Sequence, residues 1–234
     1  MTLSSLLSIR PGITALIGGG GKTTAMYTLA RELSRFGRVV CCTTTHIRPP
    51  AHLPVRNCLQ ETELDSTLAR HNCLCMGTPA ADGKLTAPLL SPAQIAAAAD
   101  YVLVEADGAR GLPMKAHLAH EPVIPASSCQ VILLVGASGF GKAVQAAVHR
   151  PDRFCQLTGV PPGTAVTPEL LSVALRREGL GDQLFINQAE TAGAMEQARR
   201  LAALLPCPVC AGSLQGGSWT CLSSFGAAGT SPQA

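Results

Sequence analysis

The feature that most constrains the fold is a run of four glycines, residues 18–21, between an apolar segment and the sequence Lys-Thr-Thr. Residues 13–17 predict a buried strand, and the residues after the glycines predict a helix. Glycine lets the backbone curl tightly and turn several N–H groups into one hollow. Because that hollow lies at a helix N-terminus, it favours an anion, and we expect a phosphate-binding loop. The residues expected to hold a nucleotide are Gly18, Gly19, Gly20, Gly21, Lys22, Thr23 and Thr24.

The glycine spacing is shorter than the common pattern, in which Gly and four further residues precede Gly-Lys-Ser/Thr. The first glycine of that pattern would fall at position 16, which is Leu16. The shortened loop resembles that of Mur-type ligases and, less closely, those of dethiobiotin-synthetase-like and metal-chaperone proteins. A glycine-rich turn without a ligand is the alternative, but it offers no packing reason for Lys22 and Thr23 at the start of a helix.

Length and composition indicate an α/β protein. Of 234 residues, 47% are hydrophobic and only 3% aromatic, which suits buried parallel strands covered by helices. We expect one P-loop NTPase-like domain over residues 1–225, a parallel sheet flanked by helices, with a small β insertion near residues 72–88 and a flexible tail over 226–234. The net charge is only +3 and no basic run occurs, which argues against nucleic acid. Without a long apolar stretch we expect no membrane association, a cytoplasmic location, and cysteines that remain thiols.

Two carboxylates follow the third predicted strand, residues 101–104. They are Glu105 and Asp107. P-loop enzymes use an acid at the end of such a strand to hold Mg²⁺ or polarise water. We therefore expect a metal site formed by Thr23, Glu105 and Asp107, and catalytic roles for Lys22 and both acids. The sequence leaves open which acid binds the metal and which acts as the base.

Further polar residues are expected to face the terminal phosphate or a second substrate. Thr45 lies in the sequence Thr-Thr-Thr-His after the second predicted strand, and ligands gather at the carboxyl ends of parallel strands. The Gly- and Pro-rich loop after Asp107 adds Arg110 and Lys115, and His120 comes shortly after. A metal site at His117-x-x-His120 is conceivable, although loop polarity or substrate contact suits a Pro-bounded loop better.

A base-contacting segment is expected after the fifth predicted strand. The sequence Asn187-Gln188-Ala189-Glu190 resembles the Asn-Lys-x-Asp of guanine-binding GTPases, so Asn187 and Glu190 are expected to contact the nucleobase. The pairs Cys73-x-Cys75 and Cys207-x-x-Cys210 each supply only half of a zinc site, and zinc is disfavoured.

The chain resembles the YqeC-like proteins, a family named for accessory proteins of selenium-dependent hydroxylases. The matching blocks are Ile17–Thr24, Thr43–Thr45, Val104–Lys115, His120–Pro125, His149–Arg153 and Phe185–Glu190. The resemblance implies a role in maturing a molybdenum hydroxylase that carries labile selenium, with that enzyme or its cofactor-handling proteins as partner. Two positions depart from the family pattern, because Arg110 and Glu190 stand where Lys and Asp are expected.

Together these features predict a protein that binds Mg²⁺ with ATP or GTP, hydrolyses the nucleotide, and thereby assists hydroxylase maturation. One alternative is an ATP-dependent ligase or kinase that acts on a small acceptor, as the Mur-like loop would suit. A second alternative is a nucleotide-binding switch without turnover. A ligase or kinase would require a small acceptor for phosphate release, whereas the accessory protein would require a partner protein. A switch would bind the nucleotide tightly and release no phosphate even with the partner present.

Overall fold

The computed structural model describes residues 1–223, which are built around a nine-stranded sheet with the order β13-β12-β11-β9-β1-β7-β2-β4-β3. Its strands are β1 (Gly12–Gly18), β2 (Val39–Thr43), β3 (Val55–Arg56), β4 (Cys73–Met76), β7 (Tyr101–Glu105), β9 (Ser128–Gly136), β11 (Gln183–Asn187), β12 (Val209–Ser213) and β13 (Ser218–Ser223). All neighbouring strands are parallel except β12 and β13. Two small pairs lie outside this sheet: β5 (Thr78–Pro79) with β6 (Leu85–Thr86), and β8 (Met114–Lys115) with β10 (Val148–His149).

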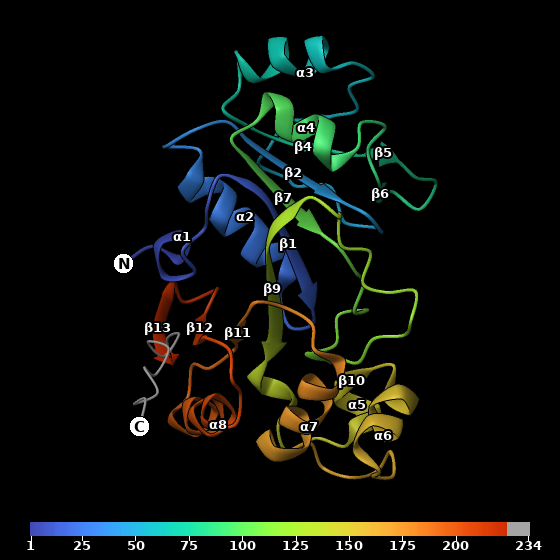
Figure 1. Ribbon diagram of the computed structural model, residues 1–234, viewed down its shortest axis with the longest axis vertical. Helices are drawn as coiled ribbons and strands as arrows, with labels where there is room; N and C mark the ends of the chain where they lie inside the picture. The colour runs from blue at the N-terminus through green and yellow to red at the C-terminus, as the bar shows by residue number, and fades with distance from the viewer. Residues whose placement is uncertain (224–234) are drawn as a thin grey trace, which may run out of the picture.

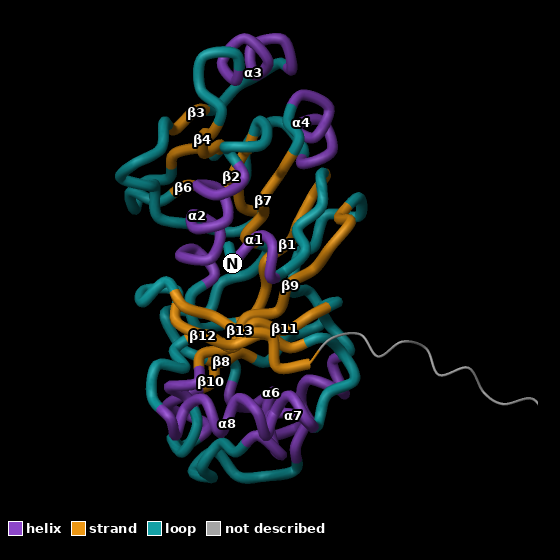
Figure 2. The backbone as a smooth tube through the Cα atoms, turned by 90° about the vertical axis from the view of Figure 1, so that its left-hand side faces the viewer, coloured by secondary structure: helices purple, strands orange, loops and turns teal. Residues whose placement is uncertain are grey.

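Helices cover both faces of the sheet (Figures 1 and 2). The helices are α1 (Leu3–Leu6), α2 (Lys22–Leu33), α3 (Glu61–Leu68), α4 (Pro92–Ala98), α5 (Val144–Ala147), α6 (Pro151–Thr158), α7 (Pro168–Glu178) and α8 (Ala192–Ala203), with a 3₁₀ turn, η1, at Ala137–Gly139. Alternate residues of each strand enter different cores, as period-2 strands require. On β9, Ile132 packs with α1 and α2, whereas Leu133 packs with α6, α7 and α8 on the other face. A third cluster joins α3 and α4 to β2, β4 and β7.

The register of the central strands sets the position of the glycine loop. Glu105, the last residue of β7, pairs with Leu16 of β1 on one side and with Thr43 of β2 on the other. β1 continues to Gly18, and α2 begins at Lys22. The carboxyl ends of three adjacent strands therefore meet where the phosphate-binding loop was expected, as in other open parallel sheets.

The expected α/β fold with a parallel sheet is confirmed, with differences at its edges. The insertion near residues 72–88 is smaller than expected, because β4 pairs in parallel with β2 and β3 and only β5 and β6 form a separate hairpin. Strand β4 belongs to the main sheet because the side chains of β4 are apolar and mostly buried. Strand β13 was not expected. The predicted tail, 226–234, lies outside the described residues. Within residues 1–223, no helix is both long and apolar enough to span a membrane.

Candidate functional site

The glycine loop presents the N-terminus of α2 rather than its own first amides. The N–H groups of Gly18, Gly19 and Gly20 donate to Asp107 Oδ2, Leu134 O and Leu112 O at 3.0, 2.9 and 3.1 Å. These three amides are thus used by the protein itself. The first N–H groups of α2 have no partner within the helix, and they carry its positive dipole end. In this structure, an anion at the loop would be bound by the amides at Lys22 and Thr23 rather than by the first glycines.

Lys22 folds back over the loop and is buried. Its Nζ donates to Gly18 O at 2.5 Å and forms an ion pair with Asp107 Oδ1 at 3.1 Å. The nearer oxygen of Glu105 lies 4.0 Å away. The ammonium is therefore held next to the α2 N-terminus by one carbonyl and one carboxylate, and a phosphate placed there would meet a fixed positive charge.

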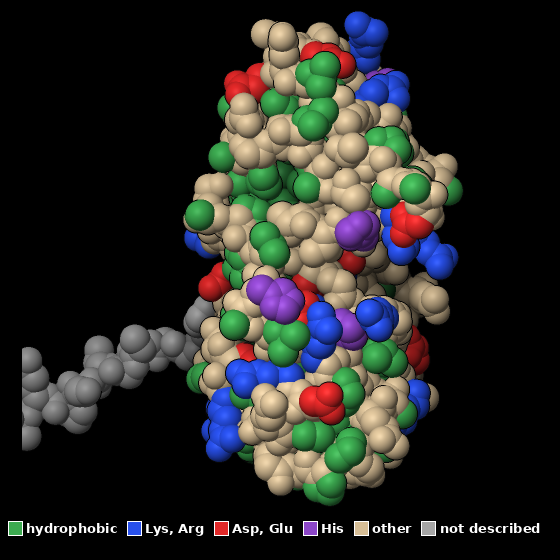
Figure 3. All heavy atoms as spheres, turned by 90° about the vertical axis from the view of Figure 1, so that its right-hand side faces the viewer, with side chains coloured by type: hydrophobic (Ala, Val, Ile, Leu, Met, Phe, Trp, Pro, Cys, Tyr) green, Lys and Arg blue, Asp and Glu red, His purple; other side chains and the backbone are tan. Residues whose placement is uncertain are grey.

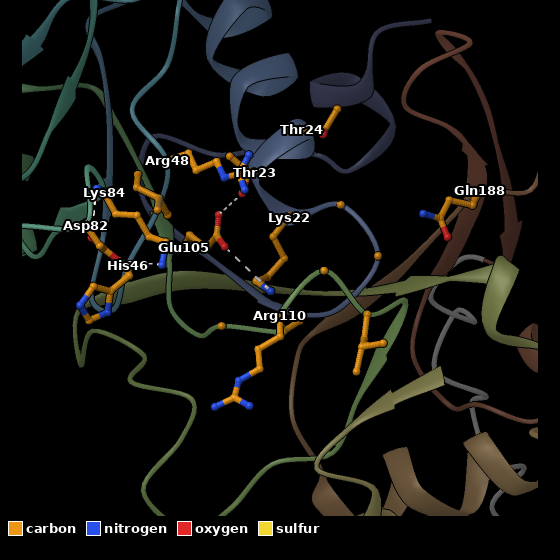
Figure 4. Close-up of a pocket in the computed structure, with 17 residues that line it drawn as sticks. Lys22, Thr23, Thr24, His46, Arg48, Asp82, Lys84, Glu105, Arg110 and Gln188 are labelled. Carbon is orange, nitrogen blue, oxygen red and sulfur yellow. Dashed lines mark hydrogen bonds and ion pairs between the residues drawn. The ribbon is translucent and has the colours of Figure 1, made fainter. Parts of the chain in front are cut away.

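Thr23 and Glu105 form a pair of hard oxygen ligands beside Lys22. The Thr23 hydroxyl donates to Glu105 Oε2 at 2.6 Å, and the two side chains point toward each other (Figure 4). Burial raises the pKa of Glu105, although the charge of Lys22 and the Thr23 hydrogen bond act against that rise. Mg²⁺ prefers a few protein oxygens completed by phosphate and water. Thr23 and Glu105 fit that ion, because both oxygens lie beside the anion-binding helix end.

Asp107 belongs to a buried network and not to the open cleft. Its side chain is fully buried, and besides Lys22 and Gly18 N its carboxylate contacts His117 Nε2 at 2.8 Å and Lys115 Nζ at 3.3 Å. Burial alone would raise the pKa of Asp107, but the His117 hydrogen bond and the two lysine charges outweigh it and lower the pKa to about 2. Asp107 thus stays ionised and positions Lys22 and the loop backbone, and Glu105 is the acid that reaches the cleft.

The network extends away from the loop through His117 and Lys115. His117 Nδ1 contacts Glu178 Oε2 at 2.9 Å, at the end of α7. Its pKa is raised: burial opposes the charged form, but hydrogen bonds to Asp107 and Glu178 favour it. Lys115 Nζ also contacts Glu121 Oε2 at 2.8 Å and Gly108 O at 2.7 Å. Lys115 was expected to face a substrate; it is buried among these partners instead.

A cleft of about 720 Å³ opens beside the loop. The cleft is formed by the loop and the start of α2, by Glu105 and Gln188, and by the segments after β2, between β5 and β6, and after β7. Its lining residues are Gly20–Thr24, His46–Arg48, Asp82, Lys84, Glu105, Gly108–Leu112 and Gln188. The cleft thus contains Lys22, Thr23, Glu105 and Arg110 from the sequence prediction.

Five polar or charged lining side chains, His46, Arg48, Asp82, Lys84 and Gln188, were not predicted as site residues. His46 and Gln188 directly follow predicted positions, so the strand-end rule could have found them. Arg48, Asp82 and Lys84 lie in Pro- and Gly-rich loops whose paths the sequence pattern does not reveal.

Other expected site residues lie outside the cleft. The Asn187 amide is buried, donating to Gly20 O at 2.7 Å and accepting from Leu214 N at 2.9 Å, so it supports the loop backbone. Glu190 lines a separate cavity next to β13. Thr45 is half-buried and bonds with Thr43, and His120 is exposed on a turn. The structure therefore brings Lys22, Thr23 and Glu105 together at the cleft, but Asp107, expected as a metal ligand, is buried behind the loop, and the base-contacting pair, Thr45 and His120 lie elsewhere.

Among residues 1–223, no group of three or more His, Cys, Asp and Glu side chains is arranged to hold a metal ion. His117, half of the conceivable His-x-x-His site, already contacts a carboxylate with each ring nitrogen. His120 lies exposed, away from that network. All ten cysteines are free thiols.

Comparison with known proteins identifies relatives over most of the chain. The chain is 36% identical over 181 residues to the Escherichia coli (strain K12) protein named "Uncharacterized protein YqeC", a match that covers 73% of this chain and 70% of that protein. Among solved structures, the signal recognition particle 54 kDa protein from Aeropyrum pernix K1 in complex with GDP aligns with a TM-score of 0.42 and 16% identity, covering 91% of this chain and 44% of that one. The family model described as "YqeC protein" matches residues 14–152. The glycine loop, Glu105, Asp107 and the network residues Lys115, His117 and Glu121 fall within that match, and the chain belongs to the YqeC family.

Proposed function

We propose that this protein binds a nucleoside triphosphate with Mg²⁺ in the cleft beside the glycine loop and hydrolyses it. The observation that carries the proposal is the arrangement of Lys22, Thr23 and Glu105 at the N-terminus of α2, with contacts of 2.6 Å between Thr23 and Glu105 and 4.0 Å between Lys22 and Glu105. Enzymes that transfer phosphoryl groups use a positive charge, oxygen ligands for Mg²⁺ and a helix N-terminus close together. Lys22, the Thr23–Glu105 pair and the start of α2 provide these groups here.

Each residue has a distinct part in this proposal. The amides at the start of α2 bind phosphate oxygens, and Lys22 stabilises the charge that develops on the outer phosphates. Thr23 and Glu105 would hold Mg²⁺, which supplies charge neutralisation between phosphates when bound. Asp107 keeps Lys22 in place from behind the loop, at 3.1 Å from its Nζ. ATP and GTP are both retained as candidates, because neither Asn187 nor Glu190 lines the cleft.

Nucleotide binding to wild type and Lys22→Ala tests the proposal directly. ATP, GTP and CTP would each be titrated with Mg²⁺ by calorimetry, after circular dichroism has shown that the variant is folded. We expect the wild type to bind at least one triphosphate and Lys22→Ala to bind it roughly tenfold or more weakly, because a charge-assisted contact is lost. Lys142→Ala is the control, since Lys142 follows a similar glycine-rich turn but is exposed outside the cleft. No binding by the wild type would overturn the proposal.

The role of turnover is proposed from the family resemblance to be the maturation of a selenium-dependent molybdenum hydroxylase. Phosphate release would then increase when the hydroxylase is added to the protein with Mg²⁺ and nucleotide. A ligase or kinase would instead require a small acceptor for release. A switch module would bind tightly and release no phosphate with either addition.

A further inference from the structure

Three cations, Arg48, Lys84 and Arg110, line the cleft beside the glycine loop. They come from three separate segments: the loop after β2, the β5–β6 hairpin and the loop after β7. We name these three residues the cation wall. On the face of the molecule that carries this hairpin, Lys, Arg and His side chains gather around the middle (Figure 3). A substrate in the cleft would meet these cations in addition to Lys22, while Asp82 and Glu105 are the acids that line the same cleft.

Backbone bonds join two of the three segments of the cation wall, the Arg48 loop and the β5–β6 hairpin. Ile47 N donates to Leu85 O at 2.9 Å and Leu85 N donates to Ile47 O at 2.8 Å, which ties the Arg48 loop to the hairpin. Both Ile47 and Leu85 are buried. Asp82 accepts from Lys84 Nζ at 2.8 Å and from its backbone N at 3.1 Å, which orients that lysine. Two loops distant in sequence are therefore fixed side by side, and such preorganisation favours binding.

The two arginines of the wall have unused donors. Within residues 1–223, neither Arg48 nor Arg110 forms a side-chain hydrogen bond or ion pair, whereas Lys22 and Lys115 have several. Arg110 has a backbone φ of 50°, a left-handed conformation that costs a non-glycine residue free energy. Its side chain extends away from Lys22 and Thr23 (Figure 4). Free guanidinium groups suit planar or tetrahedral oxyanions, to which they donate two hydrogen bonds at once.

We propose that the cation wall binds the oxyanion group of a small second substrate, a carboxylate or a phosphate monoester, beside the terminal phosphate of the bound nucleotide. This inference rests on the proposed nucleotide site. A cleft of about 720 Å³ lies within the usual range for ligand pockets. Arg48 and Arg110 lie in the segments that follow β2 and β7, and β7 ends at Glu105, which also lines the cleft. The second substrate therefore lies on the side of the acid and the metal ligands.

The test measures anion binding after the nucleotide site has been filled. Wild type would be saturated with Mg²⁺ and a non-hydrolysable triphosphate, AMP-PNP or GMP-PNP, whichever binds more tightly. Inorganic phosphate and succinate would then be titrated in separate arms by calorimetry. We expect binding of at least one anion, and roughly tenfold weaker binding in the double variant Arg48→Ala/Arg110→Ala. The stronger arm identifies the substrate group as phosphate or carboxylate.

A charge-matched control is the double variant Arg31→Ala/Arg35→Ala, which removes two exposed arginines of α2 and its C-terminal turn far from the cleft lining. It should bind the anion as wild type does, and both double variants should keep the affinity for the triphosphate analogue. Loss of anion binding in the control, or no anion binding by wild type, would overturn the inference. The corresponding nucleoside diphosphate would be titrated as well. If Arg48→Ala/Arg110→Ala bound the triphosphate analogue more weakly but the diphosphate as wild type does, the wall would hold the terminal phosphate, and the inference would be overturned. Failure of the analogue to bind wild type would refute the nucleotide site itself.

Discussion

His117 contacts a buried carboxylate with each of its ring nitrogens, Asp107 on the loop side and Glu178 at the end of α7. Its backbone N–H also donates to Glu178 at 2.6 Å. None of these three side chains lines the cleft, so His117 acts on the site through Asp107, which contacts Lys22. The ring thereby connects the glycine loop to a helix on the far side of the network.

Replacing His117 should destabilise the protein strongly. In His117→Ala, Asp107 and Glu178 lose a shared donor while buried, and breaking such a buried arrangement costs about 3–5 kcal/mol. Urea denaturation would measure the free energy of unfolding. His120→Ala, which changes an exposed histidine three positions away, should cost less than about 0.5 kcal/mol. Equal costs for the two variants would mean that the ring contacts contribute no stability.

Thr23 and Thr24 offer a matched test of the metal ligands. The Thr23 hydroxyl contacts Glu105, whereas Thr24 is exposed and points away from that pair (Figure 4). Thr23→Val should remove the increase in nucleotide affinity that Mg²⁺ provides, by roughly tenfold or more, because even outer partners of a metal contribute that much. Thr24→Val should retain it. Nucleotide titrations in the presence of Mg²⁺ and in the presence of EDTA would measure this increase in affinity for each variant. If Mg²⁺ still increased the affinity of Thr23→Val as in wild type, the Thr23 hydroxyl would be excluded as a metal ligand.

At the scale of elements, the glycine loop is confined by the backbone of its neighbours. Gly20 has a φ of 72°, and a Cβ at this position would lie 2.3 Å from Gly136 N. The loop thus packs against the end of β9 with no space for a side chain, which explains why these positions are glycine.

Gly20→Ala should therefore lower the free energy of unfolding by about 2–5 kcal/mol, from left-handed strain and overpacking together. Gly163→Ala is the comparison, since a Cβ there has open space and the backbone has no positive φ. That change should be nearly neutral. Chemical denaturation of both variants gives the difference, and a tolerated Gly20→Ala would show that the loop can open away from β9.

At the scale of the whole molecule, the raised pKa of His117 makes stability depend on pH. In the unfolded chain His117 titrates near 6.5. Its contribution is fully present below that pH and is lost as the pH rises through the raised folded value. The difference in unfolding free energy between wild type and His117→Asn should therefore shrink as the pH increases above about 6.5. A constant difference across this range would show that the imidazole remains neutral in the fold.

Much of the architecture was predictable because apolar strands and the Gly-Lys-Thr sequence carry local signals. Residues 13–17 are an example: this apolar run was expected to be a buried strand, and it lies within β1 with all five residues buried. The predictions were less complete where contacts between residues distant in sequence determine the position of a side chain. Nothing local shows that Lys115 turns inward to Asp107 and Glu121, that Asn187 supports Gly20, or that Ile47 pairs with Leu85. These contacts join segments whose proximity follows only from the sheet order.

The bond from Asn187 to Gly20 also has a consequence for biosynthesis. The same amide accepts from Leu214 N, so the support of a loop near the N-terminus is completed by a residue close to the end of β12. A nascent chain that has not yet emerged from the ribosome as far as Leu214 lacks this support. The glycine loop is made early but gains this support late, so we expect the proposed nucleotide affinity to be complete only in chains that extend past Leu214.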